Sequence, residues 1–208
     1  ESEKKIVAFH EAGHALISYI LKETRPPIKV SIIPRGESAL GFSMQEPVDK
    51  KLYSKNELIS KICVLLGGRI SEEINFKKIT TGASDDIYKL TKIAYSIVTT
   101  YGMSNLIGNI NMNREKNVHY DVIDISENKK EEIDSEVNKI INKCYNFTKY
   151  ILEQNIISLT LLGNYLFENE EIIYSDFNNI FNNVNLENSM EINLDYKLNN
   201  NDLNNDDL

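Results

Sequence analysis

The 208-residue sequence contains no tryptophan, four prolines and only two cysteines. Cys63 and Cys144 are too far apart for the close cysteine spacing of a zinc knuckle, and each falls in a helix-like run. A disulfide between them would need an oxidising compartment, so the pattern favours two buried free thiols. The cysteines therefore predict neither a knuckle nor a disulfide scaffold.

Positive charge is also scarce, because 23 Lys and Arg face 31 Asp and Glu, for a net charge of −8. A general nucleic-acid binder needs a basic stripe to match phosphates, so this class is disfavoured. No apolar run reaches the ~18 residues of a membrane span, and no signal-peptide pattern opens the chain. We therefore expect this part of the protein to be soluble.

Two further absences bear on function. The sequence has no G-x-x-x-x-G-K-[ST] motif, so it cannot bind ATP by that route. It begins with Glu1 instead of methionine, and we expect residue 1 to be a boundary within a longer protein. Any ATPase module or membrane anchor then belongs to residues outside this chain.

Hydrophobic residues make up 41% of the chain, which indicates a globular protein. We predict a mainly α (α+β) fold, since apolar residues recur with helical spacing and alternate in only one region. A small β-sheet is expected near residues 28–46, with strand 28–34 pairing with 39–45 across the turn at Pro34-Arg35-Gly36. The predicted helices are 3–22, 54–74, 85–101, 127–154, 156–168 and 175–183.

Helix-capping residues support these boundaries. Ser54 and Glu57 form a capping-box pattern, and Ser126 and Ser2 are expected to cap their helices. From about residue 185 Asn, Asp, Glu and Leu dominate with weak periodicity. We therefore expect a folded domain over 1–184 and a low-complexity, disordered tail over 185–208.

The first helix contains the pattern H-E-x-x-H, as His10-Glu11-Ala12-Gly13-His14. Positions i and i+4 lie on one helix face, so both imidazoles can reach one zinc ion. Glu11 can take a proton from a metal-bound water and pass it to the leaving amine. Gly13 is a poor helix former, which suggests that another backbone approaches there.

A third ligand is required, and the residue pattern alone leaves its identity open. His119 lies in a loop-like segment, and the position where a metzincin would place its third histidine is Ile20. Two carboxylate clusters offer alternatives, Glu72-Glu73 and Asp85-Asp86. A ligand from the first cluster would instead fit a zinc aminopeptidase or related hydrolase on a gluzincin scaffold.

Several separated segments resemble the peptidase domain of the FtsH family of membrane-anchored, ATP-dependent zinc metalloproteases. The resemblance covers roughly residues 1–183 in the family's order. It rests on the segments Val7-Ala8-Phe9-His10-Glu11-Ala12-Gly13-His14, Pro34-Arg35-Gly36 with Ala39-Leu40-Gly41-Phe42, Leu66-Gly67-Gly68-Arg69 with Glu72-Glu73, Thr81-Gly82-Ala83-Ser84-Asp85-Asp86, and Tyr101-Gly102-Met103-Ser104.

The resemblance implies a zincin-like, helical endopeptidase with a C-terminal helical subdomain and one Zn²⁺ per chain. It implies Asp86 as the third ligand, although Asp85 stands where the family usually has Asn, and it makes Glu72 a carboxylate that orients a ligand histidine. The strand around Gly41, Phe42, Ser43 and Met44 would pair with an extended substrate.

For the complete protein the resemblance implies a homo-hexamer, or a hetero-oligomer with paralogues, that degrades unfolded or membrane proteins. ATP would act only in the absent ATPase module, and membrane attachment only through absent N-terminal segments. The implied location is the inner membrane of a mitochondrion, a plastid or a bacterium. A non-catalytic member of the family is the alternative, and the presence of all four residues His10, Glu11, His14 and Asp86 argues against it.

Overall fold

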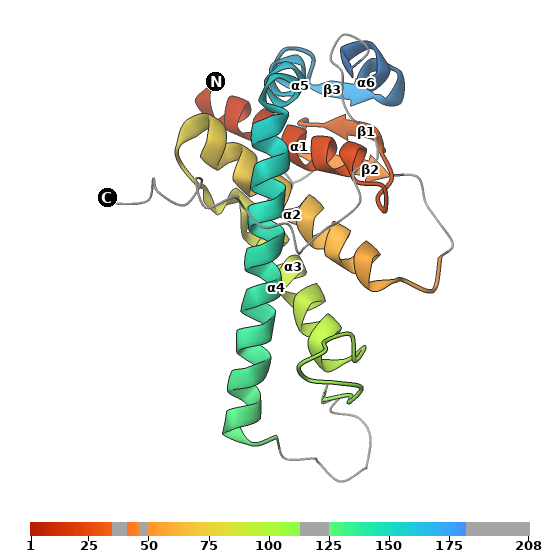
Figure 1. The fold of residues 1–208 in the computed structure, drawn as a ribbon. Helices are drawn as coiled ribbons and strands as arrows, with labels where there is room; N and C mark the ends of the chain where they lie inside the picture. The colour runs from red at the N-terminus through yellow and green to blue at the C-terminus, as the bar shows by residue number, and fades with distance from the viewer. Residues whose placement is uncertain (35–40, 46–49, 113–124, 182–208) are drawn as a thin grey trace.

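The computed structural model describes residues 1–34, 41–45, 50–112 and 125–181 (Figure 1). Within these ranges the mainly helical fold with a small sheet is confirmed. The elements follow in the order α1 (Ser2–Ile20), β1 (Pro27–Ser31), β2 (Phe42–Gln45), α2 (Lys55–Phe76), the short 3-10 helix η1 (Thr81–Ala83), α3 (Ser84–Thr99), α4 (Glu127–Gln154), α5 (Ile156–Asn169), β3 (Glu171–Ile173) and α6 (Tyr174–Phe181).

The sheet has three antiparallel strands in the order β2-β1-β3. The predicted pairing of β1 with β2 is confirmed, with Val30 opposite Ser43. Their predicted turn lies, from residue 35 onward, outside the described residues. The sequence did not predict β3, which is only three residues long and shows little alternation. It forms because Ile172 is fully buried opposite Val30 in the central strand.

Helices α1 and α2 cross with their backbones in close contact. A β-carbon built on Gly13 would lie 2.2 Å from the carbonyl oxygen of Gly67, and one built on Gly67 would lie 2.7 Å from that of Gly13. The close backbone approach inferred from Gly13 is therefore confirmed. The Ser71 hydroxyl also donates to the Phe9 carbonyl oxygen over 2.6 Å, which joins the two buried helix faces.

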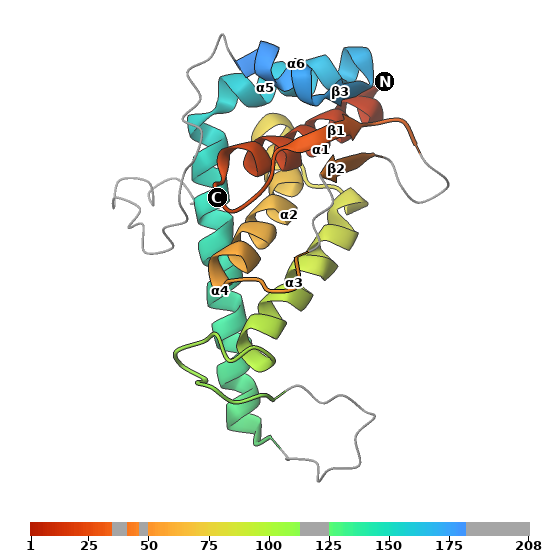
Figure 2. The same ribbon diagram turned by 90° about the vertical axis from the view of Figure 1, so that its right-hand side faces the viewer.

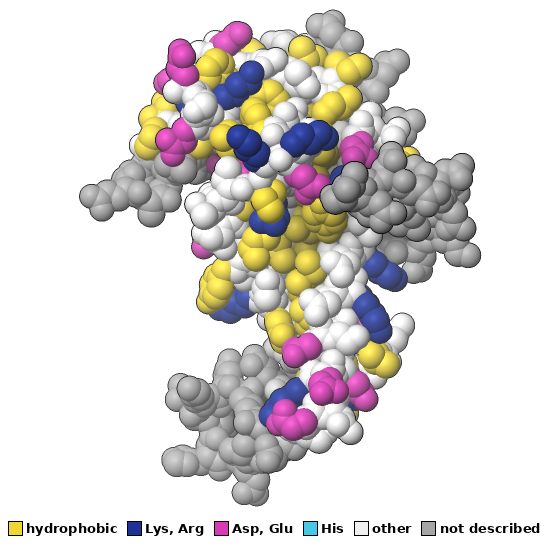
Figure 3. Space-filling model, turned by 90° about the vertical axis from the view of Figure 1, so that its left-hand side faces the viewer, with side chains coloured by type: hydrophobic (Ala, Val, Ile, Leu, Met, Phe, Trp, Pro, Cys, Tyr) yellow, Lys and Arg dark blue, Asp and Glu magenta, His cyan; other side chains and the backbone are white. Residues whose placement is uncertain are grey.

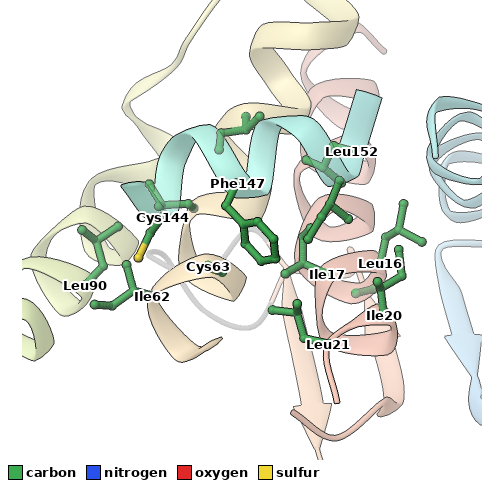
Figure 4. Packing of buried hydrophobic residues seen from close by; sticks show 14 of the residues in the cluster. Leu16, Ile17, Ile20, Leu21, Ile62, Cys63, Leu90, Cys144, Phe147 and Leu152 are labelled. Carbon is green, nitrogen blue, oxygen red and sulfur yellow. The ribbon is translucent and has the colours of Figure 1, made fainter. Parts of the chain in front are cut away.

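The long helix α4 runs along most of the molecule, and α5, α6 and the sheet gather at one end (Figures 1 and 2). The inner face of α4 contributes Cys144, Phe147 and Leu152 to a core shared with α1 and α2 (Figure 4). Cys63 from α2 lies in the same core. Both cysteines are buried and free, so the prediction of two unpaired thiols is confirmed.

The capping predictions succeed at two helices and fail at one. Ser54 and Glu57 form the full capping box at α2, and the Ser126 hydroxyl accepts from the Lys129 N–H at α4. At α1 the prediction is wrong, because the helix begins one residue earlier: Ser2 lies inside its first turn and Glu1 occupies the cap position without a side-chain hydrogen bond.

Two observations concern the ends and the surface of the chain. The proposed boundary between residues 184 and 185 lies outside the described residues and stays a prediction. Among the described helices, none is both long and apolar enough to cross a membrane.

On the face shown in Figure 3, apolar side chains gather at mid-height, while acidic and basic side chains are interspersed above and below them.

We predict that Gly13→Ala destabilises the protein, although alanine is the better helix former by about 1 kcal/mol. The new methyl group would overlap the Gly67 carbonyl and lie 2.7 Å from the Ser71 β-carbon. Overpacking of this kind costs roughly 1–3 kcal/mol, and backbone atoms cannot move aside as a side chain can. Urea denaturation should therefore show a lower midpoint for this variant.

Gly82→Ala is the matched control, since its β-carbon would meet only the Thr80 hydroxyl oxygen at 3.2 Å. We expect its midpoint to stay near that of the unmodified protein. Equal midpoints for the Gly13→Ala variant and the unmodified protein would show that the two helices can separate without cost.

Candidate metal centre

Helix α1 carries both histidines of the H-E-x-x-H pattern on one buried face. The Nε2 atoms of His10 and His14 lie 3.0 Å apart, and the two rings meet edge to face. Both residues are buried. The one-turn spacing thus brings the two imidazoles together as the sequence predicts.

Helix α3 supplies the carboxylate, because η1 places its first turn above the two imidazoles. The Asp86 Oδ2 atom lies 3.2 Å from His10 Nε2 and 3.1 Å from His14 Nε2. The Asp86 side chain is 18% exposed, whereas the neighbouring Asp85 is 70% exposed and forms an ion pair with Lys89. Of these two carboxylates, Asp86 is the one that contacts both imidazoles.

The outer ring nitrogens have partners that fix how each imidazole is oriented. His10 Nδ1 lies 2.6 Å from Glu72 Oε1, and the second Glu72 oxygen accepts from the Thr80 backbone N–H. His14 Nδ1 lies 2.7 Å from the Val64 carbonyl oxygen. Both partners can only accept, so each Nδ1 carries a hydrogen and each ring turns its Nε2 toward Asp86.

The converging atoms fit a cation. Two imidazole Nε2 atoms and a carboxylate oxygen face one another within 3.2 Å, and their lone pairs repel unless a proton or a metal ion lies between them. Zinc ligands about 2.0–2.1 Å from a tetrahedral ion are themselves about 3.4 Å apart, close to the observed separations. A β-carbon on Gly68 would lie 2.6 Å from both Nε2 atoms, so glycine keeps this space open.

The charges of the cluster perturb its titration. Burial opposes a charge on His10, but hydrogen bonds with Asp86 and Glu72 outweigh it and raise its pKa to about 9. Burial also opposes the Asp86 carboxylate, yet its hydrogen bonds to the two histidines hold its pKa below the ordinary value. The site therefore attracts positive charge strongly enough to keep a proton where a cation would sit.

Glu11 lies beside the cluster in a cleft of about 850 Å³ that also contains His10, His14 and Asp86. It is buried, and burial raises the pKa of its carboxyl group against the lowering effect of the two imidazoles. A β-carbon on Gly41 would lie 2.6 Å from Glu11 Oε1. The start of β2 therefore packs against this carboxylate.

The structure also places the remaining predicted residues. Gly41, Phe42 and Ser43 line the cleft, and Met44 is exposed further along β2. Glu72 touches the outer nitrogen of His10, as expected for an orienting carboxylate, and is not directed at the metal position. The gluzincin arrangement, which needs a Glu ligand, is therefore disfavoured by this geometry. His119 lies outside the described residues.

Comparison with known protein families matches residues 1–180 to peptidase family M41. The chain belongs to peptidase family M41. This confirms the resemblance found in the sequence and its assignment to the metalloproteases. The cluster of His10, His14 and Asp86 thus lies in a peptidase domain.

Similar M41 proteins include three named ATP-dependent zinc metalloprotease FtsH. The protein from Chlorobium luteolum is 41% identical over 183 residues, which cover 86% of this chain and 26% of that protein. Those from Syntrophobacter fumaroxidans and Endomicrobium trichonymphae are 42% identical, over 82% and 86% of this chain and 28% and 30% of their own lengths. The chain therefore spans less than a third of these relatives.

Sequence reasoning missed several contacts of the M41 site. The Val64 carbonyl and the Thr80 N–H are backbone groups, which no residue pattern reveals. Gly68 and Gly41 gave a signal, because each belongs to a glycine-containing motif, but the pattern did not show that they make room for the imidazoles and for Glu11.

We predict that Glu72→Gln weakens zinc binding by roughly tenfold, in the range typical for loss of an outer partner of a ligand histidine. Both Glu72 oxygens accept, from His10 and from Thr80, and an amide would turn an NH₂ group toward one of these donors. Competition for zinc with a chromophoric chelator measures the change.

Glu73→Gln is the matched control, because Glu73 bonds to Tyr145 and Lys149 on α4. It makes the same chemical change one residue away and should leave zinc affinity unaltered. If the two variants lost affinity equally, Glu72 would have no special role in orienting His10.

Proposed function

We propose that this chain is the proteolytic module of a zinc endopeptidase, with one zinc ion held by His10, His14 and Asp86. The observation that carries the proposal is the convergence of two imidazole Nε2 atoms and a carboxylate oxygen. Glu11 lines the same cleft, where it would serve as the general base beside the metal. Membership of peptidase family M41 supports the same conclusion.

Each residue then has a defined part in peptide hydrolysis. When bound here, zinc would lower the pKa of a water toward ~7 and polarise the scissile carbonyl. Glu11 would accept a proton from the attacking water and deliver it to the leaving amine. Glu72 and the Val64 carbonyl keep the Nδ1 protons in place, so both Nε2 lone pairs remain available.

Strand β2 offers a way to hold the substrate. It pairs with β1 on one side and forms an edge of the described sheet, and its residues Phe42 and Ser43 line the metal cleft. An extended polypeptide could add to this edge through main-chain hydrogen bonds, which depend little on side chains. Gly41, Phe42, Ser43 and Met44 are the residues that we assign to this role.

We extend the proposal to the complete protein on the basis of its relatives, which are named ATP-dependent. The complete protein would be a membrane-anchored hexamer that feeds unfolded or membrane proteins to this domain. Its ATPase and membrane segments would lie outside this chain. The membrane segments would anchor the protein in the inner membrane of a mitochondrion, plastid or bacterium. The zincin-like arrangement and the C-terminal helical subdomain are part of the same proposal.

We predict that Glu11→Gln keeps zinc but lowers the rate of peptide cleavage by roughly 10²–10⁴-fold, the usual contribution of a general base. The amide matches the carboxylate in shape and cannot accept the proton. Zinc content and cleavage of an unfolded protein should be measured on the same preparation. Glu3→Gln, at the outer end of α1 in the same cleft, is the control and should retain activity. Undiminished cleavage by the Glu11→Gln variant would reject Glu11 as the base.

We also predict that Asp86→Asn lowers zinc affinity by more than the roughly 10–100-fold expected for loss of an outer partner. The neutral amide is a much poorer ligand than the carboxylate that it replaces. Asp85→Asn changes the same group on an exposed side chain and should leave the zinc content intact. Equal loss of zinc from the two variants would refute the assigned ligand set.

A further inference from the structure

A second cavity, of about 990 Å³, lies beside the metal cleft. It is bounded by α2, by α3 and by the turn that follows α1, which lie near one another in Figure 2. Basic side chains dominate its charged lining. They are Lys22, Arg25, Lys50, Lys61, Lys89 and Lys92, against the acidic Glu23 and Glu57.

This basic cavity adjoins the metal cleft. Val64, Leu65 and Lys89 line both. The Val64 carbonyl also holds the outer nitrogen of His14, so the shared wall directly adjoins a proposed zinc ligand. A polypeptide that leaves the metal cleft past this wall would meet the basic groups next.

Of the basic side chains in the lining, Lys61 and Lys92 form no ion pair with another described residue, whereas two others do. Lys50 pairs with Glu57, and Lys89 pairs with Asp85. Lys61 instead lies 3.6 Å from the centre of the Tyr53 ring, a contact that positions the ammonium group without cancelling its charge. Lys92 has no ion pair among the described residues.

The basic lining of this cavity contrasts with the charge of the rest of the protein. The chain carries a net charge of −8, and the face in Figure 3 mixes both signs. The metal cleft itself is lined by five carboxylates, those of Glu3, Glu11, Glu72, Asp85 and Asp86. A bound chain would thus cross from a strongly acidic cleft into a basic cavity.

The cavity also has an apolar wall, formed by Leu58, Val64, Leu65 and Ile93 beneath the charged groups. Such a surface suits a side chain that has a short hydrocarbon stem and an anionic end. Nucleic acid or an anionic membrane would be matched by basic groups spread along an open surface. These groups instead line a concavity that adjoins a peptidase cleft, which favours a peptide ligand.

We propose that the basic cavity is a substrate subsite that selects acidic side chains near the peptide bond cut at the metal centre. The proposal rests on the proposed function, because it assumes that a polypeptide occupies the metal cleft. Lys61 and Lys92 are the specificity-determining residues. They act on the substrate by charge attraction and take no part in bond cleavage.

The test compares two fluorescent peptides that differ only in three glutamates or three glutamines beside one potential cleavage site. Their binding to the zinc-loaded Glu11→Gln protein is followed by anisotropy, which requires no catalysis. We expect the acidic peptide to bind roughly tenfold more tightly at low ionic strength, and the difference to shrink as salt is added.

The double variant Lys61→Gln, Lys92→Gln, made in the same background, should reduce this preference to less than about threefold, since charge steering depends on nearby cations. Lys129→Gln with Lys130→Gln is the matched control. It removes the same charge from exposed ion pairs in the first turn of α4 and should keep the preference. Cleavage of both peptides is then measured with the protein that keeps Glu11.

Equal binding of the two peptides would overturn the proposal, and so would a preference that survives loss of Lys61 and Lys92. Binding of a random oligonucleotide or of phosphatidylglycerol vesicles that depends on these two lysines, without a preference for the acidic peptide, would overturn it in favour of another ligand. Preferred binding without cleavage would instead contradict the proposed peptidase function. Cleavage without charge preference would leave that function standing and remove the subsite.

Discussion

The close contact between α1 and α2 is the constraint on which the site depends. Gly13 and Gly67 let the two backbones touch, and Gly68 leaves space in front of the imidazoles. At this separation α2 can offer Glu72 to one histidine and the Val64 carbonyl to the other. A wider spacing would leave both Nδ1 atoms without partners and both rings free to turn.

The contact also determines the electrostatics of the cleft. Fixed outer partners keep the Nε2 atoms directed inward, and α3 adds the Asp86 carboxylate to them. The result is a buried group of acceptors and negative charges, in which the protonated state of His10 is strongly favoured. The fold therefore builds an attraction for a cation before any cation is bound, which is the preorganisation that metal sites require.

The two neighbouring cavities differ in the charge of their linings. Five carboxylates line the metal cleft, whereas five lysines and an arginine, against two glutamates, line the basic cavity. Because an extended chain binds a sheet edge through its backbone, β2 by itself would discriminate little between sequences. Side-chain preference would then arise away from the strand, in the basic cavity that adjoins the metal cleft.

The sequence by itself determined the two histidines, the glutamate between them, most helix boundaries and the pairing of β1 with β2. These follow from local spacing and capping, as the Ser54 and Ser126 caps illustrate. Glycine at position 13 even indicated a close helix contact. The α1 cap was predicted wrongly because more than one residue near the chain start could precede the first turn.

Only the tertiary structure distinguished Asp86 from Asp85 and Glu72 on physical grounds. All three are carboxylates in helices, and the choice depends on which one the chain path brings to within 3.2 Å of both imidazoles. The tertiary structure also determined where the short strand β3 forms, which backbone groups contact the histidines and where the basic cavity lies. Each of these joins residues far apart in the chain, and local sequence patterns carry no information about such distances.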